Sequence, residues 1–280
     1  MKMVRKDQNV IKGLGPGTRG AVARFISACQ ARGKTGFSLD ELMQAAELSR
    51  AAARQQIARL ATGVRRVTPR SEYFLIINPE YQRVGAPPID RWLGAYMRFC
   101  RQPYYVGLLS AAARHGSASQ AVQLVQVLTD RPTRDIELGG LRVEFFVKKA
   151  LASTPILETP GTFAPLLVST PEATILDLIA YSPRLGGVRR VAQVAEGLLP
   201  VVRPRGLKKA LDAIEDASTK QRCGYLLDHL NRADLAMLVK DSLPDRPHRT
   251  PLQVRMPSTP AHRIAQPWNI IENISLGTLD

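Results

Sequence analysis

Residues 38–60 read SLDELMQAAELSRAAARQQIARL, the pattern of two short helices joined by a tight turn. Ser38 precedes Glu41 by three positions, which is the spacing of a capping box at the start of the first helix. Ser49 is a natural N-cap for the second helix. A longer helix is predicted upstream, between residues 21 and 31, because apolar side chains recur there on one face. These side chains are Val22, Phe25, Ile26 and Cys29.

The helix that follows Ser49 is predicted to turn small and basic residues outward and to carry no acid on that face. Small residues allow a helix to enter the major groove of DNA. A glutamine there can pair with adenine, and an arginine can pair with guanine or a phosphate. The expected DNA-binding residues of this segment are Ser49, Arg50, Arg54, Gln55 and Arg59.

Residues 64–78, VRRVTPRSEYFLIIN, predict a β-hairpin that turns at Pro69-Arg70-Ser71. Its basic residues are placed to reach the DNA backbone or the minor groove. They are Arg65, Arg66 and Arg70. Three helices followed by a basic hairpin predict a winged helix-turn-helix in residues 1–85. Winged helices also serve as protein-interaction modules, but the acid-free helix face favours DNA here.

The charge of the chain is concentrated in two places. The 280 residues hold 39 Lys and Arg against 24 Asp and Glu, a net charge of +15, which favours a polyanionic partner. Residues 1–90 carry 15 basic and 7 acidic side chains, and residues 184–209 carry seven and one. The second basic patch consists of Arg184, Arg189, Arg190, Arg203, Arg205, Lys208 and Lys209.

A Gly- and Pro-containing segment, NPEYQRVGAPPIDRW, predicts a domain boundary, and we place the two domains at residues 1–85 and 86–280. The larger C-terminal domain is expected to be mixed α/β, which makes the whole chain α+β. The helices expected there cover residues 89–100, 104–116, 169–182, 188–199, 206–216 and 219–230. The strands expected there cover residues 121–130, 135–149 and 165–169.

Several site classes are excluded by the sequence. Three cysteines without a CxxC pair, and four scattered histidines, exclude a zinc finger and a disulfide scaffold and indicate a reducing cytoplasmic compartment. No apolar run approaches the roughly 18 residues of a membrane span, so no membrane partner is expected. We expect no metal and no cofactor.

No catalytic residue is assigned from the sequence. Gly116-Ser117 with the later pair Asp135 and Glu137 has the residue types with which a nucleotidyltransferase holds magnesium. The 17 intervening residues are more than such a site usually allows, and Ser117 ends a predicted helix instead of following a strand.

Four strings in this order resemble the AbiEi-type antitoxins, transcriptional regulators of type IV toxin–antitoxin and phage-abortive-infection systems. They are EYFLIINPEYQRVGAPPIDRW, QPYYVGLLSAAARHG, VSTPEATILDLI and QRCGYLLDHL, and the chain closes with PWNIIEN. The second and third strings are the specific ones, because generic helix patterning does not explain them. The resemblance covers most of the chain, from about residue 16 onward.

The resemblance implies a repressor whose winged helix binds inverted repeats in its own promoter, with at least two copies on the operator. It also implies a C-terminal antitoxin domain, and a partner toxin similar to the AbiEii nucleotidyltransferases that it counteracts without necessarily forming a stable complex. The second basic patch then either extends the DNA contact or forms the antitoxin surface. Two alternatives stay open: an enzyme acting on nucleic acid or on the toxin, and a protein-binding module that only binds the toxin.

Overall fold

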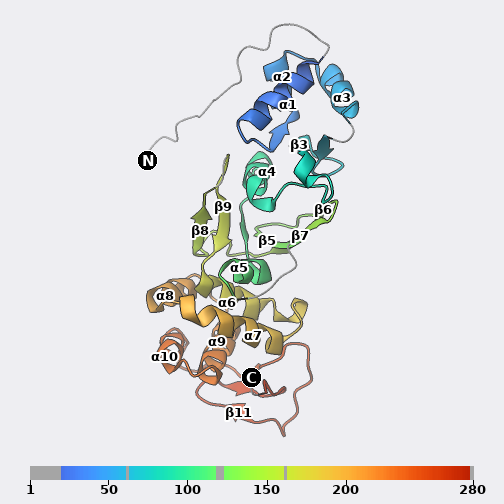
Figure 1. The fold of residues 1–280 in the computed structure, drawn as a ribbon. Coiled ribbons are helices and arrows are strands. Elements are labelled where there is room, and N and C mark those ends of the chain that lie inside the picture. The colour runs from blue at the N-terminus through green and yellow to red at the C-terminus, as the bar shows by residue number, and fades with distance from the viewer. Residues whose placement is uncertain (1–19, 61–62, 118–122, 161–162, 278–280) are drawn as a thin grey trace. The chain divides into compact units, whose positions relative to one another are not determined.

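The computed structural model describes residues 20–60, 63–117, 123–160 and 163–277 (Figure 1). The chain divides into two compact units. Unit 1 comprises residues 1–101, 136–142 and 160–165, and unit 2 comprises residues 102–135, 143–159 and 166–280. The first stretch of unit 1 thus extends beyond residue 85, and the domain boundary between residues 85 and 86 stays a prediction.

Three helices of unit 1 lie where the sequence predicts them. The hydroxyl of Ser38 accepts the backbone N–H of Glu41 (3.1 Å), which is the first half of the expected capping box. The Glu41 carboxylate pairs instead with Lys34. Apolar residues of all three helices form one core with Phe37 and Phe74. The helices are α1 (Ala21–Ala31), α2 (Leu39–Ala46) and α3 (Arg50–Ala58).

A three-stranded antiparallel sheet accompanies these helices, in the order β1-β3-β2. The hairpin between β2 and β3 confirms the expected one, and Val64 pairs with Ile76 at its base. The first strand was not expected, because it is only three residues long. The strands are β1 (Gly36–Ser38), β2 (Val64–Arg66) and β3 (Tyr73–Ile76). The single turns η1 (Pro79–Tyr81) and η2 (Ile89–Arg91) and the helix α4 (Leu93–Phe99) follow.

The sheet of unit 2 has its strands in the order β7-β5-β4-β9-β8. The central pair β4 and β9 is parallel, and the pairs β4–β5 and β8–β9 are antiparallel. Its strands are β4 (Tyr104–Val106), β5 (Leu124–Thr129), β7 (Leu141–Val147), β8 (Ile156–Thr159) and β9 (Leu166–Ser169). β6 (Ile136–Leu138) and the first two residues of β7 belong to unit 1.

Helices α5 to α10 gather on one side of this sheet (Figure 1). Tyr105 and Phe146 of the sheet pack into the same core as these helices. The helices are α5 (Leu108–Arg114), α6 (Pro171–Ala180), α7 (Val188–Leu198), α8 (Pro204–Asp212), α9 (Ala217–His229) and α10 (Ala233–Asp241). Two single turns, η3 (Ser182–Arg184) and η4 (Leu199–Val201), flank α7. The short strands β10 (Thr250–Pro251), β11 (Ile264–Ala265) and β12 (Ile270–Ile271) form a third sheet.

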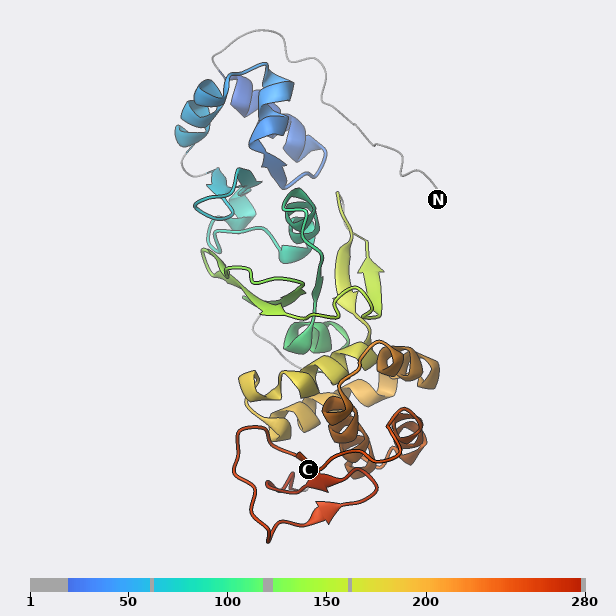
Figure 2. The same cartoon turned by 180° about the vertical axis from the view of Figure 1, so that it is seen from behind.

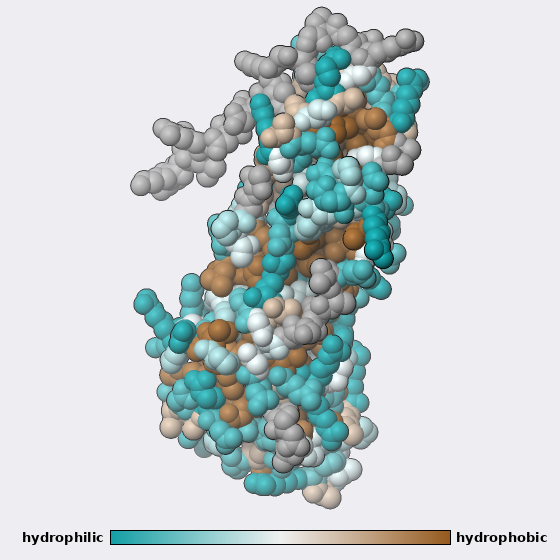
Figure 3. All heavy atoms as spheres, viewed as in Figure 1, coloured by the Kyte–Doolittle hydropathy of each residue, from teal (hydrophilic) through white to brown (hydrophobic). Residues whose placement is uncertain are grey.

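The structure confirms a mixed α and β chain and corrects two of the expected helices. Of the expected helix over residues 89–100, residues 89–91 form the turn η2 and only residues 93–99 are α-helical. The sequence predicts a continuous helix over residues 104–116, but residues 104–106 form the strand β4 and only residues 108–114 are helical. Within the described residues, no helix is both long and apolar enough to span a membrane. On the face seen in Figure 3, hydrophilic side chains cover most of the helical part of unit 2, with smaller hydrophobic areas between them.

Candidate nucleic-acid interface

Helix α3 starts at a serine cap and holds its apolar residues in the core of unit 1. The hydroxyl of Ser49 accepts a hydrogen bond from the backbone N–H of Ala52 (3.3 Å). Ala53 and Ile57 are buried on the inner side. Gln55 lies exposed on the outer side. The cap and the two buried residues therefore fix which side chains α3 presents to solvent.

Two arginines of α3 are engaged by carboxylates from other elements of unit 1. Arg50 donates through Nη1 to both oxygens of Glu72 (2.7 and 2.6 Å) and through Nη2 to Asp40 (3.1 Å). Arg54 also donates to Glu72. The hydrogen bond from Arg54, supported by Arg50, holds the pKa of Glu72 below its usual range. The face contributed by α3 itself is free of acids, as expected, but the fold brings two carboxylates to it.

The hairpin β2–β3 has a turn closed by two hydroxyl groups. Thr68 and Ser71 each accept the backbone N–H of the other through their side-chain oxygens (3.2 and 3.3 Å). Arg66 folds back along the hairpin, donating through Nη1 to the carbonyl of Pro69 (2.9 Å). Its guanidinium lies 5.3 Å from the centre of the Phe74 ring. Arg66 is therefore exposed but held against the hairpin by these two contacts.

Three further basic residues expected at the interface are exposed. Arg59 is the C-cap of α3, and Arg65 and Arg70 lie on the hairpin. The Arg65 guanidinium packs beside Gly85, where an added Cβ would stand 2.8 Å from Arg65 Nη1. Gly85 has φ +80, so a side chain there is also disfavoured by the backbone. All the residues expected to bind DNA therefore lie in unit 1. The side chains of Arg50, Arg54 and Arg66 are held by contacts within that unit.

The second basic patch is divided between two regions of unit 2. Helices α7 and α8 lie apart in both views of the ribbon, and α6 packs against each of them (Figures 1 and 2). Near α7, Arg184 stacks over the Phe146 ring (4.0 Å to its centre) and Arg189 donates to the carbonyl of Ser275 (2.6 Å). The members of the patch that α7 and α8 carry, or that cap α8, are exposed: Arg189, Arg190, Arg203, Arg205, Lys208 and Lys209.

A buried polar cluster joins the two most specific sequence strings. Asp177 of α6 accepts a hydrogen bond from the Tyr105 hydroxyl (2.7 Å) and another from Lys148 Nζ (2.6 Å). Only 3% of the Asp177 side chain and 12% of the Lys148 side chain are exposed. Burial raises the pKa of Asp177, while the Lys148 charge opposes that rise. This cluster is a satisfied core network that holds α6 to the sheet.

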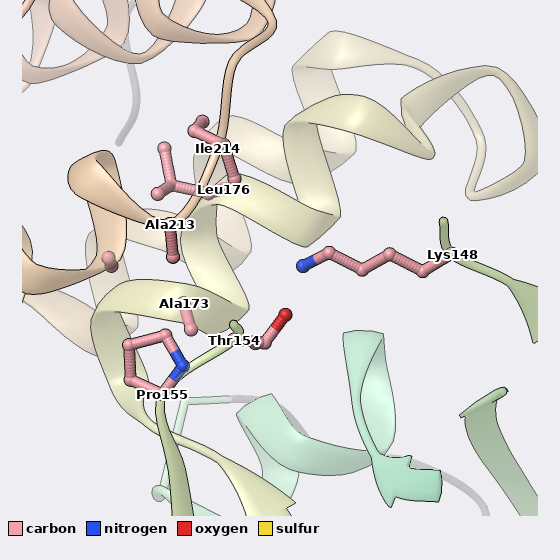
Figure 4. Close-up of a pocket in the computed structure, with 8 residues that line it drawn as sticks. Lys148, Thr154, Pro155, Ala173, Leu176, Ala213 and Ile214 are labelled. Carbon is pink, nitrogen blue, oxygen red and sulfur yellow. The ribbon is translucent and has the colours of Figure 1, made fainter. Parts of the chain in front are cut away.

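A shallow pocket adjoins this cluster in unit 2. Lys148 extends toward it with its amine directed at Thr154 and α6 (Figure 4). The remaining lining is apolar and comes from α6, from α8 and the two residues after it, and from the segment before β8: Pro155, Ala173, Leu176, Ala210, Ala213 and Ile214. Because Lys148 already pairs with Asp177, the pocket offers no free charged group.

Two of the residues considered for magnesium chemistry make hydrogen bonds to the backbone of unit 2. The Ser117 hydroxyl donates to the carbonyl of Val194, and Asp135 accepts the backbone N–H of Phe145 (3.0 Å). Glu137 is exposed. Across the part of the chain that the structure describes, no three His, Cys, Asp or Glu side chains form a group suited to a metal ion.

Residues of the string QRCGYLLDHL contact two residues nearer the C-terminus, His248 and Trp268. The Gln221 side-chain amide donates to the carbonyls of His248 and Trp268 (2.8 Å each). Trp268 Nε1 donates to Asp228 (2.5 Å), and the indole ring lies against Gly224. These contacts therefore hold the PWNIIEN string against α9.

Fold and site together describe a chain with a basic helix-and-hairpin unit and a second unit built on a five-stranded sheet covered by helices. Residues 105–229 match the family model described as the AbiEi antitoxin C-terminal domain. This match confirms the resemblance to the AbiEi-type antitoxins. The matched range begins within the string QPYYVGLLSAAARHG and ends within the string QRCGYLLDHL.

A solved structure supports the fold over nearly the whole chain. The crystal structure of the RV2827C protein from Mycobacterium tuberculosis has a TM-score of 0.63 and 14% sequence identity. The alignment covers 94% of this chain and 94% of that one. At this identity the likeness is one of fold alone. The comparison with curated proteins found no match.

Proposed function

We propose that this chain is an antitoxin and a transcriptional autorepressor. It binds inverted repeats in the promoter of its own operon, with at least two copies on the operator, and counteracts a nucleotidyltransferase toxin in the cytoplasm without acting as an enzyme. The AbiEi antitoxin match over residues 105–229 is the observation that carries the antitoxin role. The toxin is of the AbiEii type and need not form a stable complex with the antitoxin.

The topology of unit 1 supports a DNA-binding role for residues 1–85 as a winged helix-turn-helix. The element order α1-β1-α2-α3-β2-β3, with the sheet order β1-β3-β2, is the order expected of a winged helix and supports this proposal. In such a domain α3 is the recognition helix and the β2–β3 hairpin is the wing. Helix α3 exposes Gln55 between arginines, and the hairpin adds three more basic residues. Residues 86–280 then form the antitoxin domain.

A gel-shift titration tests the repressor role. The probe is about 200 base pairs from upstream of the gene, an unrelated promoter is the competitor, and the salt concentration is varied. Competitor-resistant binding that maps to inverted repeats is expected. Weak binding that is equal for both DNAs, and lost at moderate salt, would contradict a repressor, because phosphate contacts alone give that behaviour.

Gln55→Ala is expected to relax the sequence preference of the protein. Gln55 is the exposed side chain of α3 best suited to read a base edge, so its loss should cost about 1–3 kcal/mol on the operator and little on unrelated DNA. The measurement is the Kd on both duplexes at one salt concentration. Gln44→Ala, also exposed but on α2, is the control. An equal loss on both DNAs would show that Gln55 does not read sequence.

Charge reversal on α8 is expected to impair toxin neutralisation and to leave promoter binding intact. Lys208 and Lys209 are exposed on α8, whereas Arg189 of α7 already donates a hydrogen bond to a carbonyl of its own unit. Lys208→Glu with Lys209→Glu should therefore reduce the growth rescue of cells that express the toxin. Arg189→Glu with Arg190→Glu is the matched variant, and promoter repression is assayed for both. Lost repression with intact rescue in the α8 variant would assign that surface to DNA instead.

A further inference from the structure

Glu72 stands where the proposed recognition helix and the proposed wing meet. It accepts hydrogen bonds from Arg50 and Arg54 of α3 and is itself the residue before β3. We propose that Glu72 is a specificity-determining residue. It restrains the two arginines electrostatically, so that binding to non-operator DNA is weakened and the guanidinium groups are held for base reading. The proposal rests on the proposed function of unit 1 as a DNA-binding domain.

The charges of the cluster cancel. Two guanidinium groups face two carboxylates, because Asp40 completes the set through Arg50. Sequence-independent affinity for DNA comes from cations that replace condensed counterions at phosphates. An arginine that already neutralises a carboxylate contributes little to that term until the carboxylate is displaced or protonated. Arg50 and Arg54 therefore add less non-specific affinity for DNA than their charge suggests.

The same contacts hold both guanidinium groups in place while leaving them accessible. About half of each arginine side chain is exposed (47% for Arg50 and 51% for Arg54), against 28% for Glu72. Arg54 reaches Glu72 through Nη2 alone, so its Nη1 donors are not used in that pair. Base reading needs a guanidinium in a fixed orientation, since the bidentate pair with guanine is planar. A phosphate contact has no such requirement.

Comparing Glu72→Gln with a matched control separates the restraint of Arg50 and Arg54 from the general effect of removing one acidic side chain. The matched control is Glu80→Gln, because Glu80 is exposed in η1 and its carboxylate accepts one long hydrogen bond, from Asn78 (3.4 Å). The full-length variants are titrated with promoter DNA and with an unrelated duplex of equal length over a range of salt concentrations. Thermal unfolding is recorded for each variant.

Glu72→Gln is expected to tighten binding to the unrelated duplex about tenfold and to steepen its salt dependence by about one in log–log slope, because the cluster gains one net positive charge while Arg50 keeps its pair with Asp40. The preference for the promoter over the unrelated duplex should fall. Glu80→Gln should change neither value. Adding Arg54→Gln to Glu72→Gln should remove most of the gained affinity.

Two results would overturn the role of Glu72 while leaving the proposed function standing. One is that Glu72→Gln and Glu80→Gln bind both DNAs alike. The other is that Glu72→Gln weakens binding to both DNAs equally and lowers the unfolding temperature, which assigns Glu72 to the fold. If the unaltered protein binds neither DNA, the proposed DNA-binding function fails, and the role of Glu72 fails with it.

Discussion

Lys148→Met is expected to lower the free energy of unfolding of unit 2 by about 3–5 kcal/mol at neutral pH. Methionine keeps the apolar stem of the side chain but removes the charge that pairs with Asp177. The buried carboxylate then keeps only the hydrogen bond from Tyr105. An unpaired charge in a core costs far more than the loss of an exposed ion pair. Lys149→Met, at the exposed neighbouring position, should change stability little.

The loss of stability should also depend on pH. Burial raises the folded-state pKa of Asp177 above its unfolded value, and Lys148 opposes that rise. For such a group, stability is lost as the pH increases from the unfolded pKa to the folded one. Without the lysine charge the folded pKa rises further and this interval widens upward. Lys148→Met should therefore be more damaging at about pH 8 than at about pH 5, where Asp177 can take up a proton.

The two tryptophans allow unit 2 to be followed alone. Trp92 is buried in unit 1 and Trp268 in unit 2, and the chain contains no others. In a Trp92→Phe background, urea unfolding followed by tryptophan fluorescence reports on unit 2. Equal stabilities for Lys148→Met and Lys149→Met, or a loss that is independent of pH, would contradict the assigned role of the Asp177 cluster.

Gly224→Ala is expected to destabilise unit 2 by about 3 kcal/mol, at the upper end of the range for overpacked cores. An added Cβ would stand 2.1–2.5 Å from three ring atoms of Trp268. The ring cannot withdraw easily, because its Nε1 is bonded to Asp228 and the Trp268 carbonyl is bonded to Gln221. The measurement is urea unfolding followed by circular dichroism.

A second substitution tests whether the clash causes that loss. Trp268→Leu removes the ring and is destabilising alone, because Trp268 is buried. Combined with Gly224→Ala, it should cost less than the sum of the two single changes by about 1–3 kcal/mol. Strict additivity would place the effect of Gly224→Ala in the helix backbone and not in the contact with Trp268.

Local sequence signals predicted the elements of unit 1 well, because caps and helical periodicity act over a few residues. Ser38 and Ser49 cap the helices that their positions indicated. The pattern of residues 104–106 wrongly predicts a helix where the chain forms the strand β4. All three of its residues are buried, and a short apolar run with both faces covered has no alternation to distinguish it from a buried helix. Helix α10, β1 and β8 were not expected from the pattern at all.

The candidate site could be predicted only as far as single residues. The sequence identified Arg50, Arg54 and Gln55, but Glu72 lies 22 and 18 residues from the two arginines it binds. Likewise, Asp177 meets Tyr105 across 72 positions of sequence. No local pattern encodes such pairs, because they arise only when the elements pack. The second basic patch shows the opposite case. Its residues are close together in the sequence, but the fold divides them between α7 and α8.

The neutralised pair on α3 also bears on the kinetics of the proposed DNA complex. Long-range attraction depends on the net field of a surface, which at Arg50 and Arg54 is reduced by Glu72 and Asp40. Diffusional approach is then guided by cations outside this cluster, such as Arg70 on the hairpin, and α3 engages only at close range. Ionic strength should accordingly change the association rate through the hairpin, while the lifetime of the bound complex is set at α3.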